Sequence, residues 1–329
     1  MPENLTMKSL YKNDGNRTLL DCPRRIPTCL VPAGVLDTLG HTPLLPIKSA
    51  CQATGCKILA KAEYMNPGGS VKDRIARFIV TQAEQRGELK PGGTILEVTS
   101  GNTGIALSMV GAIKGYKVVV VMPASVSAER RNMIQAFGAE LRLIERLTGI
   151  QAAVEEAEQQ AVEDPMIFLP RQFSNPDNAL CHQQTTGAEI LAQLSGPIDA
   201  FVTGVGTGGT LMGVARALSR AGQRCRIVAV EAAESAVMSG EAPGEHGIQG
   251  LADGFIPELV RLDAINEVAT VTTSEARERA KRLAQEDGLL VGISAGANLV
   301  ATERVAERMG PGHTLVTILP DRGERYLSV

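Results

Sequence analysis

From about residue 57 onward, the chain alternates short runs of β-branched residues with segments whose apolar residues recur at helical spacing. The runs predicted to be strands are 57–64, 93–100, 116–124, 139–145, 166–173, 199–205, 226–231, 267–273, 289–294 and 313–320. The predicted helices are 71–87, 103–115, 127–138, 150–164, 185–194, 210–222, 274–288 and 295–310. Because continuous apolar strands that alternate with helices form parallel sheets covered on both faces, the pattern predicts an α/β fold. A length of 329 residues suggests about two domains.

Composition and charge narrow the possible partners. The chain is 44% hydrophobic, and its net charge of −3 gives no electrostatic basis for binding nucleic acid or an anionic membrane.

The longest apolar stretch is too short to span a bilayer. Residues 1–34 lack periodicity and are interpreted as an N-terminal extension rather than a secretory signal. Six scattered cysteines without metal-ligand spacing predict neither a zinc site nor a disulfide framework. We therefore expect a cytoplasmic protein.

Glycine is over-represented and unevenly placed. The 34 glycines are about a tenth of the chain, against a typical usage of roughly 7%. They concentrate in 66–72, 99–104, 204–210 and 292–296, each of which joins a predicted strand or loop to a predicted helix. Ligands of open parallel sheets gather at such turns, so these segments predict one composite site.

Lys72 is a candidate nucleophilic amine. It follows the Gly68-Gly69 turn, with Ser70 as the expected N-cap and Asp73 at a capping-box position, so it should lie in the first turn of a helix. A cation there opposes the helix dipole, which helps to lower the pKa of the amine. The alternatives are a solvated lysine beside Asp73 and a residue that forms a Schiff base with a carbonyl cofactor.

The segment 204–210, Gly-Val-Gly-Thr-Gly-Gly-Thr, follows a predicted strand and opens a predicted helix. Its backbone amides suit a phosphate. It fits the dinucleotide pattern G-x-G-x-x-G, and Glu231 ends the next strand where a ribose-binding acid is expected. Its second threonine and extra glycine instead suit a single phosphomonoester. This segment alone leaves both ligands open, together with a purely structural turn.

Three further segments offer polar groups. Thr99 to Gly104 presents hydroxyls, an amide and backbone donors that suit a substrate carboxylate, or serves only as a helix cap. Gln172 is expected at the end of a strand, and Ser294, which follows the apolar run 289–293 and precedes a predicted helix, is either an N-cap or a functional residue. The four histidines show no triad or metal spacing, and no G-x-S-x-G is present, which argues against an α/β-hydrolase.

The combined motifs resemble the cysteine synthase family of pyridoxal-phosphate (PLP) β-replacement enzymes, the O-acetylserine sulfhydrylases, which are related to cystathionine β-synthase. The matching segments are 66–74, 99–104, 172–176, 204–213, 248–257, 292–294 and 323–328. The resemblance implies a tryptophan-synthase-β-like fold (PLP fold type II), in which two domains each have a twisted, mostly parallel sheet flanked by helices. It implies a larger PLP-binding domain of residues 35–66 and 178–329, and a smaller, mobile domain of residues 67–177.

The family's roles transfer to the matching positions. By resemblance, Lys72 holds the cofactor as a Schiff base and removes the substrate Cα proton, Asn102 bonds the ring hydroxyl, and Ser294 faces the ring nitrogen. The implied phosphate ligands are Gly206, Thr207, Gly208, Gly209 and Thr210. The implied substrate-binding residues are Thr99, Ser100, Thr103, Gln172 and Gly250. No metal is implied.

The implied reaction makes L-cysteine and acetate from O-acetyl-L-serine and sulfide. Pro320 resembles the O-acetylserine type, Asp321-Arg322 resembles the branch that also uses thiosulfate, and Asp253 stands where many members have a small residue. One alternative is a related β-replacement enzyme that uses O-phosphoserine as the activated serine, or thiosulfate, homocysteine or an amine as the nucleophile. Another is a regulatory protein that keeps the fold without turnover. The resemblance also implies a homodimer and, in some members, binding of serine acetyltransferase.

Overall fold

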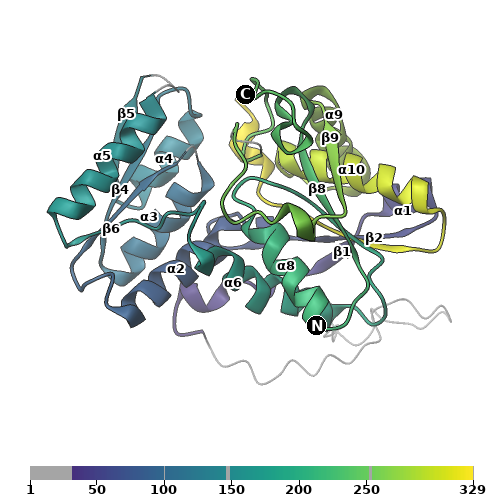
Figure 1. The fold of residues 1–329 in the computed structure, drawn as a ribbon, viewed down its shortest axis with the longest axis horizontal. Coiled ribbons are helices and arrows are strands. Elements are labelled where there is room, and N and C mark those ends of the chain that lie inside the picture. The colour runs from purple at the N-terminus through teal and green to yellow at the C-terminus, as the bar shows by residue number, and fades with distance from the viewer. Residues whose placement is uncertain (1–31, 100, 146–148, 252–253, 329) are drawn as a thin grey trace, which may run out of the picture. The chain divides into compact units, whose positions relative to one another are not determined.

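The computed structural model describes residues 32–99, 101–145, 149–251 and 254–328 (Figure 1). The expected extension, 1–34, lies outside the described residues except for Pro32, Ala33 and Gly34. The strands are β1 (Leu44–Pro46), β2 (Lys57–Lys61), β3 (Thr94–Val98), β4 (Lys117–Pro123), β5 (Glu140–Ile144), β6 (Ile167–Phe168), β7 (Ala200–Gly204), β8 (Arg226–Ala232), β9 (Glu267–Val271) and β10 (Thr314–Ile318). They form a six-stranded sheet in the order β1-β2-β10-β7-β8-β9 and a four-stranded sheet in the order β5-β4-β3-β6.

Every strand pair in the two sheets is parallel except β1 with β2. The α-helices are α1 (Lys48–Thr54), α2 (Lys72–Arg86), α3 (Asn102–Lys114), α4 (Ala128–Ala136), α5 (Gly149–Glu163), α6 (Pro176–Gln184), α7 (Thr186–Gln193), α8 (Gly209–Arg220), α9 (Thr273–Asp287) and α10 (Ile293–Met309). The α/β fold with parallel-dominated sheets between helices is thereby confirmed.

Alternate residues of each strand face different layers, because side chains along a strand point to opposite faces. In β7 of the six-stranded sheet, Ala200 and Val202 pack with α1, α9 and α10, whereas Phe201 packs with α6, α7 and α8. In the four-stranded sheet, Val120 packs with α2, α3 and α4, and Val119 packs with α5. The central strands of both sheets are therefore buried on both faces, which explains why β4, β7 and β8 are almost continuously apolar.

Most predicted elements are present, and two strand predictions are wrong. Residues 289–294 do not form a strand: Val291 makes only an isolated bridge to Arg322, and α10 begins at Ile293. The strand predicted over 166–173 covers only Ile167–Phe168, because Pro170 has no amide hydrogen and Arg171 adopts a φ of 49°. Gln172 consequently lies in the turn before α6 rather than at a strand end.

Three short elements, β1, α1 and α6, were not predicted from the sequence. The division into domains at 66/67 and 177/178, with the smaller domain mobile, stays a prediction. Within the described residues, no helix is long and apolar enough to cross a membrane.

Candidate active site

Lys72 is the first residue of α2, as predicted. A 3-10 helix, η3 (Glu63–Met65), and the turn 66–71 lead from β2 into α2. The backbone amide of Lys72 donates to Ser70 Oγ at 3.2 Å, but the N-cap position is Val71, so the cap is displaced by one residue from its expected place. The Asp73 carboxylate accepts a hydrogen bond from the backbone amide of Ser70, its expected capping-box partner. It also accepts one from the Gly68 amide at 2.7 Å. The turn is thus closed around the start of α2.

The turn 205–208 joins β7 to α8 and has the form of an anion cradle. A side chain at Gly206 would place its Cβ 2.3 Å from the carbonyl oxygen of Gly250. Gly208 has a φ of +80°, and a Cβ there would lie 2.5 Å from Val260 Cγ2. Glycine is therefore required at both positions. The backbone lies close to its surroundings at the N-terminus of a 12-residue helix, where amide groups and the helix dipole favour a phosphate.

Thr207 of this turn and Thr210 in the first turn of α8 both contact buried side chains of α6. Asn178 Nδ2 donates to Thr207 Oγ1 at 3.0 Å, and His182 Nε2 lies 3.2 Å from Thr210 Oγ1. The other ring nitrogen of His182 lies 2.8 Å from Thr186 Oγ1. Burial holds the pKa of His182 well below its usual range, so the ring is neutral at physiological pH.

The turn 99–101 joins β3 to α3 on the side of α6, the helix that carries Asn178 and His182. Thr103 Oγ1 donates to Gln172 Oε1 at 2.6 Å, and Asn178 Nδ2 also donates to the Gln172 carbonyl at 2.8 Å. Asn178 therefore connects the expected carboxylate-binding residues to Thr207. Thr99 Oγ1 accepts from the Gly101 amide at 3.3 Å. Ser100 lies outside the described residues.

Asp321 contacts three segments that carry predicted site residues. Asn102 Nδ2 donates to Asp321 Oδ2 at 2.7 Å, and Ser70, two residues before Lys72, forms a β-bridge with Asp321. The Gly292 amide donates to the Asp321 carbonyl at 3.0 Å, two residues before Ser294, which is 5% exposed in the first turn of α10. Asp321 therefore contacts Asn102 directly and also contacts the residues two positions before Lys72 and Ser294.

The charge on Lys72 acts on both halves of the site. Burial raises the pKa of Glu97 to about 8, and a hydrogen bond from Gln172 and the charge on Lys72 oppose this rise. The depressed pKa of His182 has burial as its main cause and receives a further contribution from Lys72. The Lys72 amine is therefore electrostatically coupled to Glu97, beside the expected carboxylate-binding residues, and to His182, beside the expected phosphate-binding residues.

The residues present fit PLP. The glycine cradle and its threonines match the phosphate, and Lys72 supplies an amine for the aldehyde. Among the described residues, Asn178 Oδ1 and Asp321 Oδ1 are buried acceptors without a hydrogen-bond partner, so polar groups remain available beside both the cradle and Asn102.

Sequence reasoning did not identify Asn178, His182 or Arg325 as parts of the site, and noted Asp321 only as a departure from the family. Arg325 donates to Asn102 Oδ1 and to the carbonyl of Gly68. These contacts join residues up to 257 positions apart, and no local spacing signals them.

Comparisons with known proteins agree with this chemistry. Residues 35–321 match the family model of pyridoxal-phosphate dependent enzymes. A cysteine synthase of Staphylococcus aureus (strain Mu50 / ATCC 700699) is 45% identical over 295 residues, which cover 89% of this chain and 95% of that protein. The crystal structure of a cysteine synthase from Entamoeba histolytica is similar with a TM-score of 0.88 and 41% identity, over 95% of this chain and 93% of that one.

An O-ureido-L-serine synthase is also similar, with a TM-score of 0.84 and 43% identity, over 90% of this chain and 94% of that one. The match to a PLP-dependent family favours the phosphomonoester over the dinucleotide as the ligand of the segment 204–210. The expected family and cofactor are confirmed. The chain belongs to the pyridoxal-phosphate dependent enzymes and, within them, to the cysteine synthase type.

Proposed function

We propose that this protein makes L-cysteine and acetate from O-acetyl-L-serine and sulfide. The observation that carries the proposal is 45% identity to a cysteine synthase over nearly the whole of both chains. The conjunction of the Lys72 turn, the glycine cradle and the Thr103–Gln172 pair supports it. In the reaction, the Cβ–O bond to acetate breaks and a Cβ–S bond to sulfide forms, so no oxidant or reductant is needed.

The residues that would hold the cofactor are Lys72, Asn102, Ser294 and the phosphate-binding residues Gly206, Thr207, Gly208, Gly209 and Thr210. When bound, PLP supplies an electron sink for the amino acid attached to it. Ser294 is uncharged, so it would bond the ring nitrogen without stabilising a proton there, which would limit electron withdrawal and favour loss of the β-substituent.

The remaining residues would bind and orient the amino acid. Thr99, Ser100, Thr103 and Gln172 hold its carboxylate, and Gly250 lines the pocket beside the cradle. Held in this way, the substrate presents its Cα proton to the Lys72 amine, which takes it as general base. The smaller domain, 67–177, is proposed to close over the substrate and exclude water.

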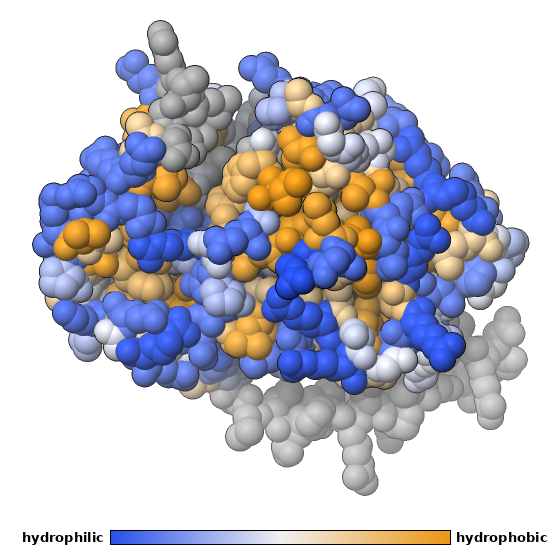
Figure 2. Space-filling view, in the orientation of Figure 1, coloured by the Kyte–Doolittle hydropathy of each residue, from blue (hydrophilic) through white to orange (hydrophobic). Residues whose placement is uncertain are grey.

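We also propose a homodimer in the cytoplasm. Figure 2 shows an apolar patch on the face around α8 and β8, and apolar patches of this kind mark association surfaces. The partly buried hydrophobic residues that pack against the core cluster containing α8 and β8 residues include Met238, Ile265 and Val268. Binding of serine acetyltransferase stays a prediction.

A steady-state comparison of leaving groups and nucleophiles tests the activity. O-acetylserine and O-phosphoserine should each be assayed with sulfide, thiosulfate, homocysteine, an amine and hydroxyurea, with Lys72→Ala as the inactive control. Hydroxyurea belongs in the set because it would give O-ureido-L-serine, the compound named for a similar structure. We expect O-acetylserine with sulfide to have the highest kcat/KM. A preference for O-phosphoserine or for another nucleophile would overturn the proposed specificity.

A further inference from the structure

Glu63 is a fully buried carboxylate that is not among the expected cofactor-binding residues. It lies in η3, just before the turn that leads to Lys72, and its exposure is 0%. Its Oε1 accepts from Thr42 Oγ1 at 2.7 Å and from Arg74 Nη2 at 2.8 Å. Its Oε2 accepts from Asn66 Nδ2 at 2.8 Å and from Arg74 Nε at 2.6 Å. Every lone-pair direction of the carboxylate is thus used by a neighbouring side chain.

Two of these donors lie at opposite ends of one short segment. Asn66 begins the turn 66–71, and Arg74 is the third residue of α2, so the same carboxylate fastens both ends of the segment that contains Lys72. The Gly40 amide donates to Asn66 Oδ1 at 2.9 Å, which fixes the orientation of the Asn66 carboxamide. Both ends of the segment are therefore held in a single geometry.

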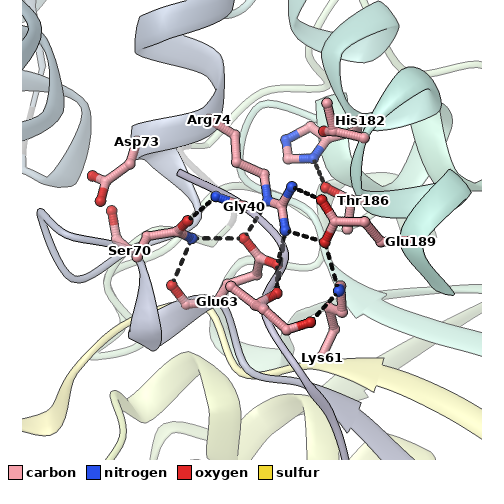
Figure 3. Close-up of polar contacts among 12 residues, drawn as sticks. Gly40, Lys61, Glu63, Ser70, Asp73, Arg74, His182, Thr186 and Glu189 are labelled. Atoms are coloured by element: carbon pink, nitrogen blue, oxygen red, sulfur yellow. Dashed lines mark hydrogen bonds and ion pairs between the residues drawn. The ribbon is translucent and has the colours of Figure 1, made fainter. Parts of the chain in front are cut away.

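Because Arg74 and Lys72 lie on the same helix, fixing the direction of the Arg74 side chain also fixes the direction of the Lys72 side chain. Residues two apart on an α-helix point to opposite sides, at about 200° from one another. The side chain of Arg74, which is 4% exposed, is buried against Glu63 and Glu189 (Figure 3). Fixing Arg74 on that side leaves Lys72 directed to the other side of α2.

The charges around Glu63 are balanced within the protein. Arg74 also donates to Glu189 at 2.7 and 2.8 Å, and Lys61 Nζ lies 2.7 Å from Glu189 (Figure 3). Burial lowers the pKa of Arg74, but the two carboxylates outweigh burial and the net shift is upward, so the guanidinium stays charged. Two cations and two anions are therefore buried together, and removal of either carboxylate leaves one uncompensated positive charge.

We propose that Glu63 is a positioning residue for Lys72. By holding Asn66 and Arg74 at once, it sets where the Lys72 amine lies relative to the phosphate-binding turn. This inference rests on the proposed role of Lys72 in holding the cofactor.

Glu189 provides a matched control. It binds the same Arg74 and belongs to the same buried charge cluster, but its hydrogen bonds in the described chain go to Arg74, Lys61 and the His41 amide rather than to Asn66. Glu63→Gln and Glu189→Gln therefore remove the same charge from the same arginine. Only Glu63→Gln also disturbs the side-chain contact to the start of the turn, where Asn66 Nδ2 then keeps its bond to the Glu63 carbonyl.

The test measures cofactor attachment in the full-length protein. Apo wild type, Glu63→Gln and Glu189→Gln are mixed with PLP, the rise of the visible absorbance band is followed by stopped flow, and thermal midpoints are recorded in parallel. We expect both variants to lose stability. We expect Glu63→Gln to slow attachment by roughly 10- to 100-fold, the scale of effect that misplacement of a reacting group produces, and Glu189→Gln to stay close to wild type.

Asn66→Ala keeps the proposal testable if Glu63→Gln does not fold, because it releases the same end of the turn without removing a charge. We expect it to slow attachment, and the double variant to be no slower than Glu63→Gln alone. Equal slowing by Glu63→Gln and Glu189→Gln, or an unchanged rate in Asn66→Ala, would overturn the inference and leave the proposed function intact. A wild-type protein that develops no visible band with PLP would overturn the role of Lys72 and, with it, the inference.

Discussion

Glu97 is a carboxyl group buried at the carboxyl end of β3, two residues before the turn 99–101. Its exposure is 5%, and it accepts a hydrogen bond from Gln172, whose Oε1 in turn accepts from Thr103. Burial raises its pKa to about 8, so it is mostly protonated at neutral pH. A neutral carboxyl at this position would let a substrate carboxylate bind to Thr103 and Gln172, as we propose, without repulsion from a second negative charge.

This shifted pKa predicts a pH dependence of stability. Between about pH 4.5, the ordinary value for a glutamate, and pH 8, the folded state keeps a proton that the unfolded state has lost. Folding is therefore disfavoured as pH rises through this window, with a slope of up to about 1.4 kcal/mol per pH unit. Glu97→Gln removes this dependence, so its stability relative to wild type should increase with pH.

Urea unfolding of the apo protein at several pH values measures this effect. The exposed Glu307→Gln on α10 is the control, because it makes the same chemical change at the surface. A stability difference between wild type and Glu97→Gln that does not change with pH would contradict a shifted pKa at Glu97.

The single residues of the site were predictable only where local sequence carries a signal. Lys72 and the glycines of 204–210 stand in patterns whose chemistry can be inferred from neighbouring positions. Asn178 and Asp321 connect those patterns through contacts across 29 and 219 positions, and nothing in their local sequence shows these contacts. Lys61, a fully buried lysine of β2, was likewise overlooked because an isolated lysine in a strand has no distinguishing pattern.

At the scale of elements, the β7–α8 turn depends on the backbone conformation of Gly208. Gly208→Ala places a Cβ at a φ of +80° and 2.5 Å from Val260. Gly222, just after α8, has a φ of +73° but open space around its Cβ position, so Gly222→Ala introduces the same backbone strain without a contact. We expect Gly222→Ala to cost about 1–2 kcal/mol of stability and to leave PLP affinity unchanged.

Gly208→Ala should cost more stability than Gly222→Ala and should also weaken PLP binding, because the turn must shift away from the geometry that accepts the phosphate. Denaturant unfolding and a PLP titration monitored by absorbance measure both effects. Equal PLP affinities in the two alanine variants would show that the turn does not hold the cofactor.

Long periodic elements were predicted well, and short elements were not. Helices such as α2 and α9 have enough turns for the apolar spacing to be read, and β4 is a continuous apolar run. The segment 289–294 is also apolar, but Leu290 is 47% exposed, α10 already begins at Ile293, and the only strand-like pairing in the described residues of the segment is the bridge from Val291 to Arg322. Apolar composition reports burial, whereas a strand also needs a partner, and the partner is set by the tertiary fold.

At the scale of the whole molecule, a few side chains join the two sheets beside the site. Arg130 of α4 donates to Gln249, which lies between β8 and β9, and its guanidinium lies 4.8 Å from the centre of the Tyr326 ring. Gln249, which precedes Gly250 of the expected substrate pocket, thus contacts α4, a helix that packs against the four-stranded sheet. Movement of the smaller domain, 67–177, would change these contacts, which is why we link them to the proposed closure.

The proposed homodimer predicts a definite molecular mass. Light scattering coupled to gel filtration should give twice the chain mass of 34.8 kDa. The apolar patch around α8 and β8 is the reason for this expectation, since its exposure in a monomer would favour association. A mass equal to one chain at micromolar concentration would contradict the dimer and leave the proposed chemistry unaffected.

The central claim is that Lys72 holds the cofactor. The protein loaded with PLP should be reduced with borohydride, digested, and its peptides identified by mass spectrometry. Lys61 is the natural competitor: burial lowers the pKa of its amine, but the amine is held by Glu189 at 2.7 Å and by the Thr42 carbonyl at 2.5 Å. We predict the modification on Lys72, unmodified Lys61, and no modification in Lys72→Ala. A wild-type protein modified on Lys61 or on no lysine would contradict the claim.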